Sequence, residues 1–143
     1  VTPDLDQYLM GHTQGLETYC QPANGYRVGE RGGQYYGVCS PEVEAAFLAA
    51  YDEGRTLYTL RSDVSRLERQ LANAEERLIA LDVEIQTLTL EVLRDGLTPE
   101  ERLALLARVK EADERKEIVE ADIVSLREAL AISREELQLY AGR

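Results

Sequence analysis

Tryptophan is absent from this chain, and phenylalanine and histidine each occur once among its 143 residues. With so few large aromatic side chains, a compact core must be built from Tyr, Leu and Val and from close contacts between backbones. The single histidine, His12, lies in the stretch MGHTQG, which matches no motif for a catalytic nucleophile or base. We therefore expect His12 to be a packing or surface residue, and we expect the protein not to be an enzyme.

Signatures of metal and phosphate sites are also missing. His12, Cys20 and Cys39 could supply metal ligands, but they lack the CxxC or HxxxH spacing that is usual in such sites. The glycines of GYRVGERGG are not followed by the GK[ST] ending of a phosphate loop, and no strand is expected before them. We expect neither a metal nor a cofactor.

Long apolar runs and clusters of basic residues are absent as well. No run of about 18 apolar residues occurs, so the sequence predicts no transmembrane helix. The formal net charge is −11, and no short segment is rich in Lys and Arg. Because nucleic acids and anionic membrane surfaces attract basic patches, neither is expected as a direct partner.

Glycine and tyrosine become scarce after Tyr58. Eight of the ten glycines and seven of the eight tyrosines lie within residues 1–58. The rest of the chain is rich in Leu, Ala, Glu and Arg, a composition typical of long helices and coiled coils. We predict an all-α protein with two domains: a small Gly/Tyr-rich helical head, residues 1–57, and a long antiparallel coiled-coil helical hairpin, residues 58–143.

A heptad repeat defines the first long helix. Ser40 is suited to the N-cap position and Pro41 to the first helical position, so the helix is expected to run from Pro41 to Arg94. Spacings of three and four residues alternate between its apolar a and d positions over five heptads, which is the pattern of a coiled coil. These positions are Leu57, Leu60, Val64, Leu67, Leu71, Ala74, Leu78, Leu81, Ile85, Leu88 and Val92.

A turn near residues 95–98 is expected to separate this helix from a second one. Gly96 breaks the first helix, and Thr98 and Pro99 begin the next as N-cap and first residue. Glu101 would complete a capping box with Thr98. Because the connection is short, the two helices should be antiparallel neighbours.

The second helix carries a matching seam with two polar positions, Lys116 and Ser133. The antiparallel return would bring Tyr140 beside the Tyr-rich head, and Leu103 and Leu106 are expected to close the tip near the turn. The positions of the seam are Leu105, Val109, Ala112, Lys116, Val119, Ile123, Leu126, Leu130, Ser133, Leu137 and Tyr140.

Lys116 has two interpretations. Its aliphatic stem can lie on apolar surface while the ammonium reaches a carboxylate at the rim, which is the commoner arrangement. Alternatively, a polar residue in a seam marks the register of the helices or a contact with a partner.

Small residues mark the helices of the head. Helices are expected over about Pro3–Tyr19, with Thr2 as its N-cap, and from Pro22 to the glycine pair at 32–33. Glycine inside a helix costs about 0.8–1 kcal/mol relative to alanine, so repeated glycines favour close approach of a second helix over a position in loops. Three pairs of small residues have this helical spacing: Gly11 and Gly15, Gly25 and Gly29, and Ala50 and Gly54.

Cys20 and Cys39 are the only cysteines of the chain. A disulfide between them would close a loop of about 20 residues and stabilise a thin core by roughly 3 kcal/mol, which requires an oxidising compartment. The alternative is two separate buried thiols in a cytosolic protein. The spacing alone does not decide between the two.

The stretches GLETYCQPANGYRVGERGGQYYGVC and FLAAYDEGRTLY resemble the family known as domain of unknown function 2799, found among lipoproteins of Gram-negative bacteria. The resemblance covers about residues 3–58. The matching residues are Gly15, Leu16, Tyr19, Cys20, Asn24, Gly25, Gly29, Gly32, Tyr36, Gly37, Val38, Cys39, Phe47, Tyr51 and Gly54.

This resemblance implies a disulfide between Cys20 and Cys39 and a location in the periplasm or cell envelope. It also implies a lipid anchor upstream of Val1. The family carries no activity that could be transferred, so the resemblance adds no catalytic or cofactor-binding residue.

We expect a non-enzymatic envelope protein that serves as a spacer or as a docking module for an unidentified envelope protein. Tyr26, Tyr35 and Tyr36 are the candidate partner-binding residues, because aromatic side chains are enriched at interfaces; the alternative is that most of these tyrosines are core. A second hypothesis is an inhibitor or immunity-type protein that blocks an envelope enzyme through the loop 32–40. Apolar residues outside the seam, Leu90 and Leu139 among them, favour a homo-oligomer formed through the coiled coil.

Overall fold

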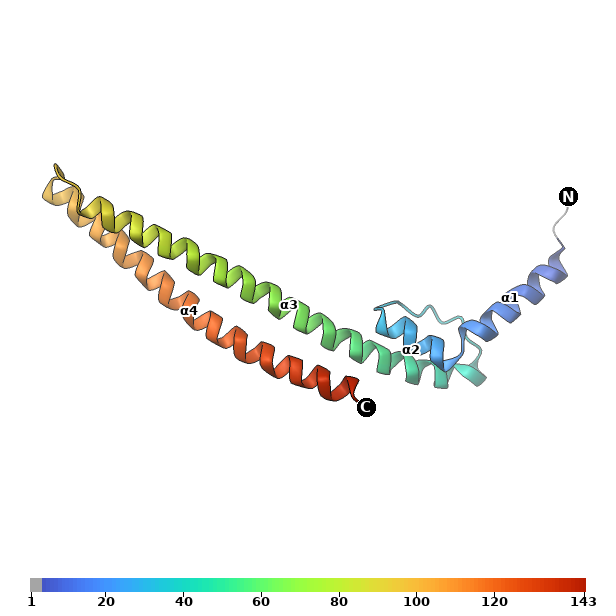
Figure 1. Cartoon of the computed structure of the whole chain (residues 1–143). Helices are drawn as coiled ribbons and strands as arrows, with labels where there is room; N and C mark the ends of the chain where they lie inside the picture. The colour runs from blue at the N-terminus through green and yellow to red at the C-terminus, as the bar shows by residue number, and fades with distance from the viewer. Residues whose placement is uncertain (1–3) are drawn as a thin grey trace. The chain divides into compact units, whose positions relative to one another are not determined.

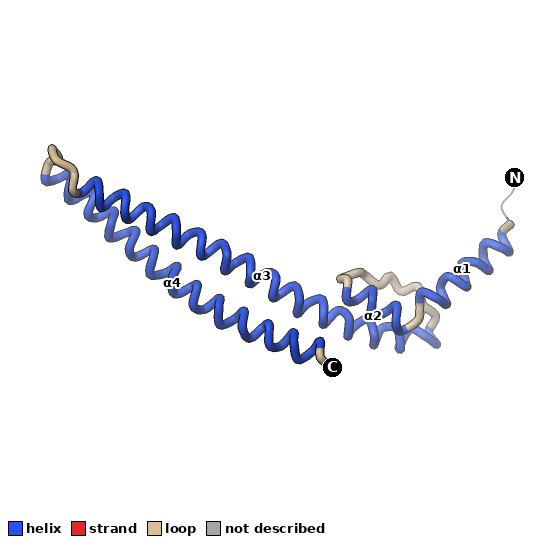
Figure 2. Tube along the Cα trace, in the orientation of Figure 1, coloured by secondary structure: helices blue, strands red, loops and turns tan. Residues whose placement is uncertain are grey.

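The computed structural model describes residues 4–143 and contains four helices (Figure 1). No residue of this range lies in a β-strand (Figure 2). The all-α fold class is therefore confirmed. The helices are α1 (Leu5–Tyr19), α2 (Pro22–Glu30), α3 (Pro41–Val92) and α4 (Pro99–Ala141).

The chain forms two compact units, which we describe separately. The head unit consists of Val1–Asp63 together with Glu136–Arg143, and the hairpin unit is Val64–Glu135. Both long helices contribute to both units. The last residues of α4 thus belong to the same unit as α1, α2 and the first turns of α3.

In the hairpin unit, α3 and α4 run antiparallel, as predicted, and bury their facing seams. Every predicted seam residue of this unit is buried or half-buried, because the heptad spacing keeps these side chains on the face that meets the other helix. The centre of this core consists of four buried residues with Leu71, Leu78 and Leu126 packed against it. The four residues are Ala74, Leu81, Val119 and Ile123.

The turn between the helices has the N-cap predicted at Thr98. Gly96 adopts a φ of +83°, a conformation that glycine reaches without the steric cost of a side chain. Thr98 Oγ1 accepts a hydrogen bond from the Glu101 backbone N–H at 3.1 Å, and α4 begins at Pro99. The Arg102 guanidinium donates to the Val92 carbonyl, placing a positive charge at the negative end of α3.

The predicted closure of the tip by Leu103 and Leu106 is wrong. Both side chains are exposed. They lie on the face of α4 that points away from the seam, so they do not cover the turn. The contact between Arg102 and Val92 links the two helices there instead.

Three exposed ion pairs link the two helices along the rims of the seam. Each pair on the surface adds little stability, but opposite charges at these positions favour one alignment of the helices over others. The pairs are Arg115 with Glu84 at 3.0 Å, Arg127 with Glu75 at 3.4 Å, and Arg134 with Glu68 at 3.0 Å.

The structure agrees with the first interpretation of Lys116, in which the ammonium reaches a carboxylate at the rim. Its side chain is half-buried in the seam, and Nζ lies 2.7 Å from Asp82 Oδ1 and 3.8 Å from Glu120 Oε1. The hydrogen bond to Asp82, together with the charge of that carboxylate, raises the pKa of the Lys116 ammonium above its ordinary value of 10.5.

In the head unit, α2 packs on α3 through glycines at its buried face. A Cβ placed on Gly25 would lie 2.5 Å from the Phe47 carbonyl oxygen, and one on Gly29 would overlap the Tyr51 carbonyl oxygen. One on Gly54 would overlap the Tyr26 carbonyl oxygen. The prediction of close backbone contact is confirmed for these glycines, which replace side chains with direct contact between helix backbones.

The same prediction is wrong for Gly11 and Gly15 of α1. Neither has an atom of another segment within 4 Å of its Cβ position. No residue of α1 is buried, because nothing in the described chain covers the length of this helix. Thr2 and Pro3 lie outside the described residues, and Asp4 serves as the N-cap, accepting from the Gln7 backbone N–H at 3.2 Å.

The end of α2 sets the path of the segment that follows it. Gly32 has a φ of +75°, and its N–H donates to the Gly29 carbonyl while the Gly33 N–H donates to the Val28 carbonyl. This pair of bonds is a Schellman motif, which needs a residue of left-handed conformation at this point. The Tyr58 ring occupies the space beside Gly32, so a side chain there would also collide with it.

Candidate functional site

A disulfide joins Cys20, directly after α1, to Cys39, two residues before the start of α3. The two sulfur atoms are 2.08 Å apart, the Cα atoms are 5.7 Å apart, and both residues are buried. The pairing that the family resemblance implied is thus present in the structure. It fixes the start of α2 and the start of α3 to each other.

Phe47 of α3 is fully buried beside this disulfide. Its ring centroid lies 5.5 Å from that of Tyr19, 5.0 Å from that of Tyr35 and 6.5 Å from that of Tyr51. Rings at these separations gain from mutual orientation as well as from burial. The only phenylalanine of the chain is therefore the centre of the head core, with tyrosines around it.

Tyr35, one of the three candidate partner-binding residues, is part of this core. Its hydroxyl donates to Glu44 Oε2 at 2.7 Å and accepts from the Cys39 backbone N–H at 3.0 Å. Burial raises the pKa of the Tyr35 hydroxyl above its ordinary value of 10, and the hydrogen bond to Glu44 raises it further. The residue fastens the loop to α3.

The beginning of the loop 32–40 is also fastened to α3. The Tyr51 hydroxyl donates to the Gly33 carbonyl at 2.8 Å, and Arg55 donates to the Gly32 carbonyl at 3.4 Å. Tyr36, the second candidate, is 79% exposed, and its hydroxyl donates to Gln34 Oε1 at 3.2 Å. The loop is held at both ends and presents Tyr36 to solvent between them.

Tyr26, the third candidate, is half-buried and lines a shallow hollow of 510 Å³. Tyr140 lines the same hollow, and its hydroxyl donates to the Glu53 carbonyl at 2.9 Å. The predicted return of Tyr140 to the Tyr-rich region is confirmed. The structure does not bring the three candidate tyrosines together into one surface.

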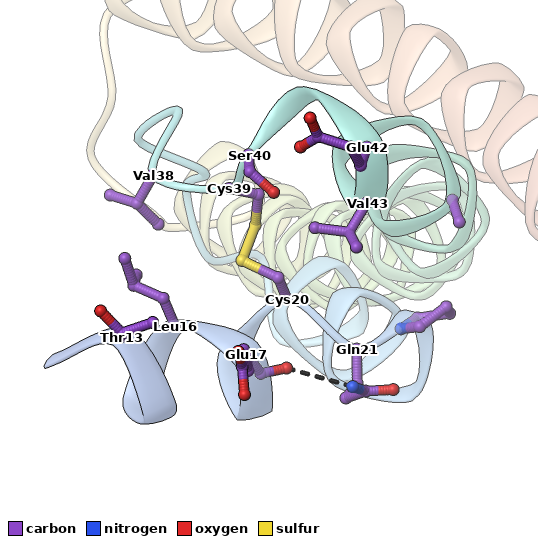
Figure 3. A pocket seen from close by; sticks show the side chains of 12 residues that line it. Thr13, Leu16, Glu17, Cys20, Gln21, Val38, Cys39, Ser40, Glu42 and Val43 are labelled. Atoms are coloured by element: carbon purple, nitrogen blue, oxygen red, sulfur yellow. Dashed lines mark hydrogen bonds between the residues drawn. A yellow bond between two sulfur atoms is a disulfide. The ribbon is translucent and has the colours of Figure 1, made fainter. Parts of the chain in front are cut away.

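A hollow of the head unit with a volume of 570 Å³ lies beside the disulfide (Figure 3). We call it the disulfide groove. Figure 3 shows the disulfide at its centre, with Leu16 and Val38 to one side and Val43 to the other. The groove is lined by Thr13, Leu16, Glu17, Cys20, Gln21, Pro22, Val38, Cys39, Ser40, Glu42, Val43 and Ala46.

The disulfide groove has an apolar interior and an acidic rim. Val38 is 46% exposed and Val43 is 42% exposed, so the groove is open to solvent. Glu17 and Glu42 supply the charge, and no Lys, Arg or His lines it. An open apolar surface with carboxylates at its edge suits an apolar side chain of a partner with basic groups beside it.

The exposed apolar face of α1 continues from this groove. Leu5, Leu9 and Leu16 lie within about 40° of one another around the helix axis, given 100° per residue. Leu5 and Leu9 are both exposed. The sequence analysis did not predict this face, because it considered only the glycines of this helix. The helical spacing of Leu5, Leu9 and Leu16 is the signal that could have revealed it.

His12 is exposed on α1, and its ring stacks on that of Tyr8 with centroids 6.2 Å apart. It does not line the disulfide groove. Within residues 4–143, no three His, Cys, Asp or Glu side chains are grouped so that they could hold a metal ion. None of the helices in this range is long and apolar enough to cross a membrane.

These features define a class of all-α protein in which a small disulfide-closed head is joined to an antiparallel helical hairpin. Residues 1–56 match the model of the family described as protein of unknown function (DUF2799). The family resemblance read from the sequence is thus confirmed over this region. Comparison with curated proteins and with solved structures gave no match.

Proposed function

We propose that this protein is a non-enzymatic component of the periplasm or cell envelope that binds another envelope protein through the disulfide groove. The carrying observation is the open apolar surface formed by Leu16, Val38 and Val43 around a disulfide. Apolar surface of this kind is usually covered by a partner. The hairpin serves as a spacer or a second docking surface, and a lipid anchor upstream would hold the protein at the membrane.

Charge supports a basic partner. Residues 4–26 contain the carboxylates Asp4, Asp6 and Glu17 and no Lys or Arg. Glu42 and Glu44 add two more near the beginning of α3. A helix or extended segment with an apolar anchor and flanking Lys or Arg residues fits the groove and its rim.

The chemistry of the groove supports a binding role rather than catalysis. Two hydroxyl side chains line the groove, those of Thr13 and Ser40. No histidine or lysine lines the groove to activate either one. An apolar surface with two carboxylates at its edge can bind and orient a partner segment. It offers no nucleophile paired with a base.

The experiment is site-specific photo-crosslinking in living cells, with a probe at Val38 in the groove and a second at Tyr36 in the loop. The matched control probe replaces Arg108 on α4. We expect a specific adduct from Val38, with a cross-linked peptide that contains apolar and basic residues. Reversal of the rim charge by Glu17→Lys and Glu42→Lys should reduce the yield. An adduct from Arg108 alone, or a yield that is insensitive to the rim charge, would overturn the assignment of the groove.

The inhibitor or immunity hypothesis has its own support in the loop 32–40. A loop held at both ends loses little entropy on binding, and Tyr36 is the exposed aromatic side chain it presents. In this case the Tyr36 probe should give the stronger adduct. The captured protein should be an enzyme whose activity falls when the purified wild-type chain is added. The Tyr36→Ala variant should inhibit this enzyme less.

A further inference from the structure

The side of α3 that faces away from α4 carries a second heptad-spaced set of residues. Beyond the buried seam, four side chains of the helix and that of Leu93, the first residue after it, are separated by four, three, four and three residues, which is the spacing of coiled-coil core positions. We call them the outer stripe: Ile79, Val83, Gln86, Leu90 and Leu93.

The outer stripe is exposed within the hairpin unit. Ile79 is 65% exposed, Val83 57%, and Leu90 and Leu93 each 71%. At 100° per residue, the stripe lies roughly opposite the buried seam of the same helix. Residues of α4 therefore cannot cover it, and four large apolar side chains remain in solvent in the single chain.

Charge is scarce beside the stripe, although 30% of the chain is charged. Ala80, Thr87 and Thr89 occupy flanking positions at its centre, and the charged residue among these positions, Asp82, is paired with Lys116 of α4. Coiled-coil surfaces that face water normally carry Glu, Lys or Arg at such positions. Flanks with so few charges next to apolar core positions are typical of a helix face that is covered by another helix.

The ends of the stripe carry opposite charges. Glu76 of α3 precedes it and Arg94, the second residue after the end of α3, follows it, and both side chains are exposed. Neither takes part in the ion pairs found among residues 4–143. Gln86 stands near the midpoint between them. A second copy in antiparallel orientation would thus bring unlike charges together at both ends.

We propose that two copies of this chain form an antiparallel dimer through their outer stripes, with the two-fold axis at Gln86. In this register Ile79 faces Leu93 of the second copy, and Val83 comes within one residue of the level of Leu90 of the second copy. Glu76 comes within about 3 Å along the axis of the level of Arg94 of the second copy, at roughly 1.5 Å per residue. The two Gln86 amides can each donate to and accept from the other.

A parallel pair of the same stripes is disfavoured by charge. It would place Glu76 against Glu76 and Arg94 against Arg94 of the second copy, and like charges at facing positions destabilise a coiled coil. The antiparallel pair also has the closed symmetry of most homodimers, in which one patch pairs with itself. No residue of the disulfide groove takes part in this dimer, which is therefore separate from the proposed binding role of the head.

The first test is sedimentation equilibrium of the full chain, which should show a dimer. Leu90→Glu should raise the dissociation constant by about a hundredfold or more, because each dimer loses two apolar side chains and gains two buried carboxylates. The matched control is Ile132→Glu, at a residue that is 58% exposed on α4 and outside the stripe. It should leave the dimer intact, and circular dichroism should show that both variants retain their helices.

The second test reads the orientation. Glu76→Arg and Arg94→Glu should each weaken the dimer, and the double variant should restore it. In oxidising buffer, a mixture of Ile79→Cys and Leu93→Cys chains should form the crosslinked heterodimer in preference to either homodimer. A crosslinked Ile79→Cys homodimer as the main product would show a parallel pair and overturn the antiparallel register.

A wild-type chain that stays monomeric at high concentration would overturn the dimer itself and point to a different helical partner. Variants of the disulfide groove should not affect either readout, so failure of the head proposal can be told from failure of this one.

Discussion

Gly54 of α3 lies directly against Gly29 of α2: a Cβ placed on Gly54 would come within 3.1 Å of the Gly29 carbonyl carbon. The same Cβ would lie 2.7 Å from the Glu30 backbone nitrogen. Both neighbours are backbone atoms of a helix, which cannot move aside as the end of a flexible side chain can. The two glycines therefore set how closely α2 can approach α3.

We expect Gly54→Ala to destabilise the head unit by about 1–3 kcal/mol, because the added methyl group overpacks a contact between two backbones. The measurement is chemical unfolding followed by near-UV circular dichroism, which reports the tyrosines clustered in the head. Gly11→Ala is the matched control. It should be neutral or stabilise α1 by about 0.5–1 kcal/mol, since no atom of another segment among residues 4–143 lies within 4 Å of the Cβ position. Equal effects from the two substitutions would contradict the proposed backbone contact.

Removal of the disulfide should destabilise the head and leave the hairpin helical. In the chain-entropy model, closing a loop of about 20 residues contributes roughly 3 kcal/mol. The variant with both Cys20→Ser and Cys39→Ser should therefore lose the near-UV tyrosine signal at lower denaturant, while far-UV helicity persists. Reductant should shift the wild type in the same direction and leave the variant unchanged.

Thiol labelling of protein taken from cells tests the compartment as well as the bond. A chain exported to the periplasm should show no free thiol when it is denatured without reductant, and two after reduction. Two labelled thiols before reduction would contradict both the disulfide in the native protein and the proposed periplasmic location.

Lys116 should make the stability of the hairpin depend on pH in the alkaline range. Its pKa is raised in the folded state by Asp82, so its contribution is fully present below the unfolded value of 10.5 and is lost as the pH rises through the folded value. The free energies of unfolding of the wild type and of Lys116→Met, measured by thermal unfolding, should therefore differ by a constant amount up to about pH 10. Above that pH the wild type should lose stability relative to the variant.

Lys110→Met is the control for this experiment, because Lys110 is exposed and forms none of the ion pairs found within residues 4–143. It shows how the loss of one lysine charge without an ion pair alters the free energy of unfolding in this range. A Lys116→Met difference that follows the same course as the Lys110→Met difference would show that the contact with Asp82 adds nothing to stability in solution.

The hairpin could be predicted almost completely from the sequence, because its determinants are local and periodic. Alternating spacings of three and four residues place the seam residues on one face of any helix. Thr98, Pro99 and Gly96 indicate the turn through capping and backbone preferences that depend on neighbours in the chain alone. The ion pair of Lys116 was one of two interpretations that its position in the seam allowed, and the structure shows that one.

The fold of the head depends on contacts between segments that are distant in sequence. The sequence alone does not show which of the possible contacts form. Gly11 and Gly29 belong to pairs with the same spacing, yet one is open to solvent and the other touches α3. Tyr35 and Tyr36 are adjacent, yet one ring packs on Phe47 and the other is in water. Their difference arises because the loop direction after Gly32 turns one side chain toward α3 and its neighbour away from it.

The sequence by itself determined the helical class, the paired seams, the turn and the family resemblance of residues 1–56. Only the tertiary structure decided that Leu16, Val38 and Val43 meet beside the disulfide, and that the apolar side of α1 stays uncovered. The physical reason is that periodicity fixes which residues share a face of a helix. Which of those faces finds a partner within the chain depends on how the segments are held together, here by one disulfide and by backbone contacts at glycine.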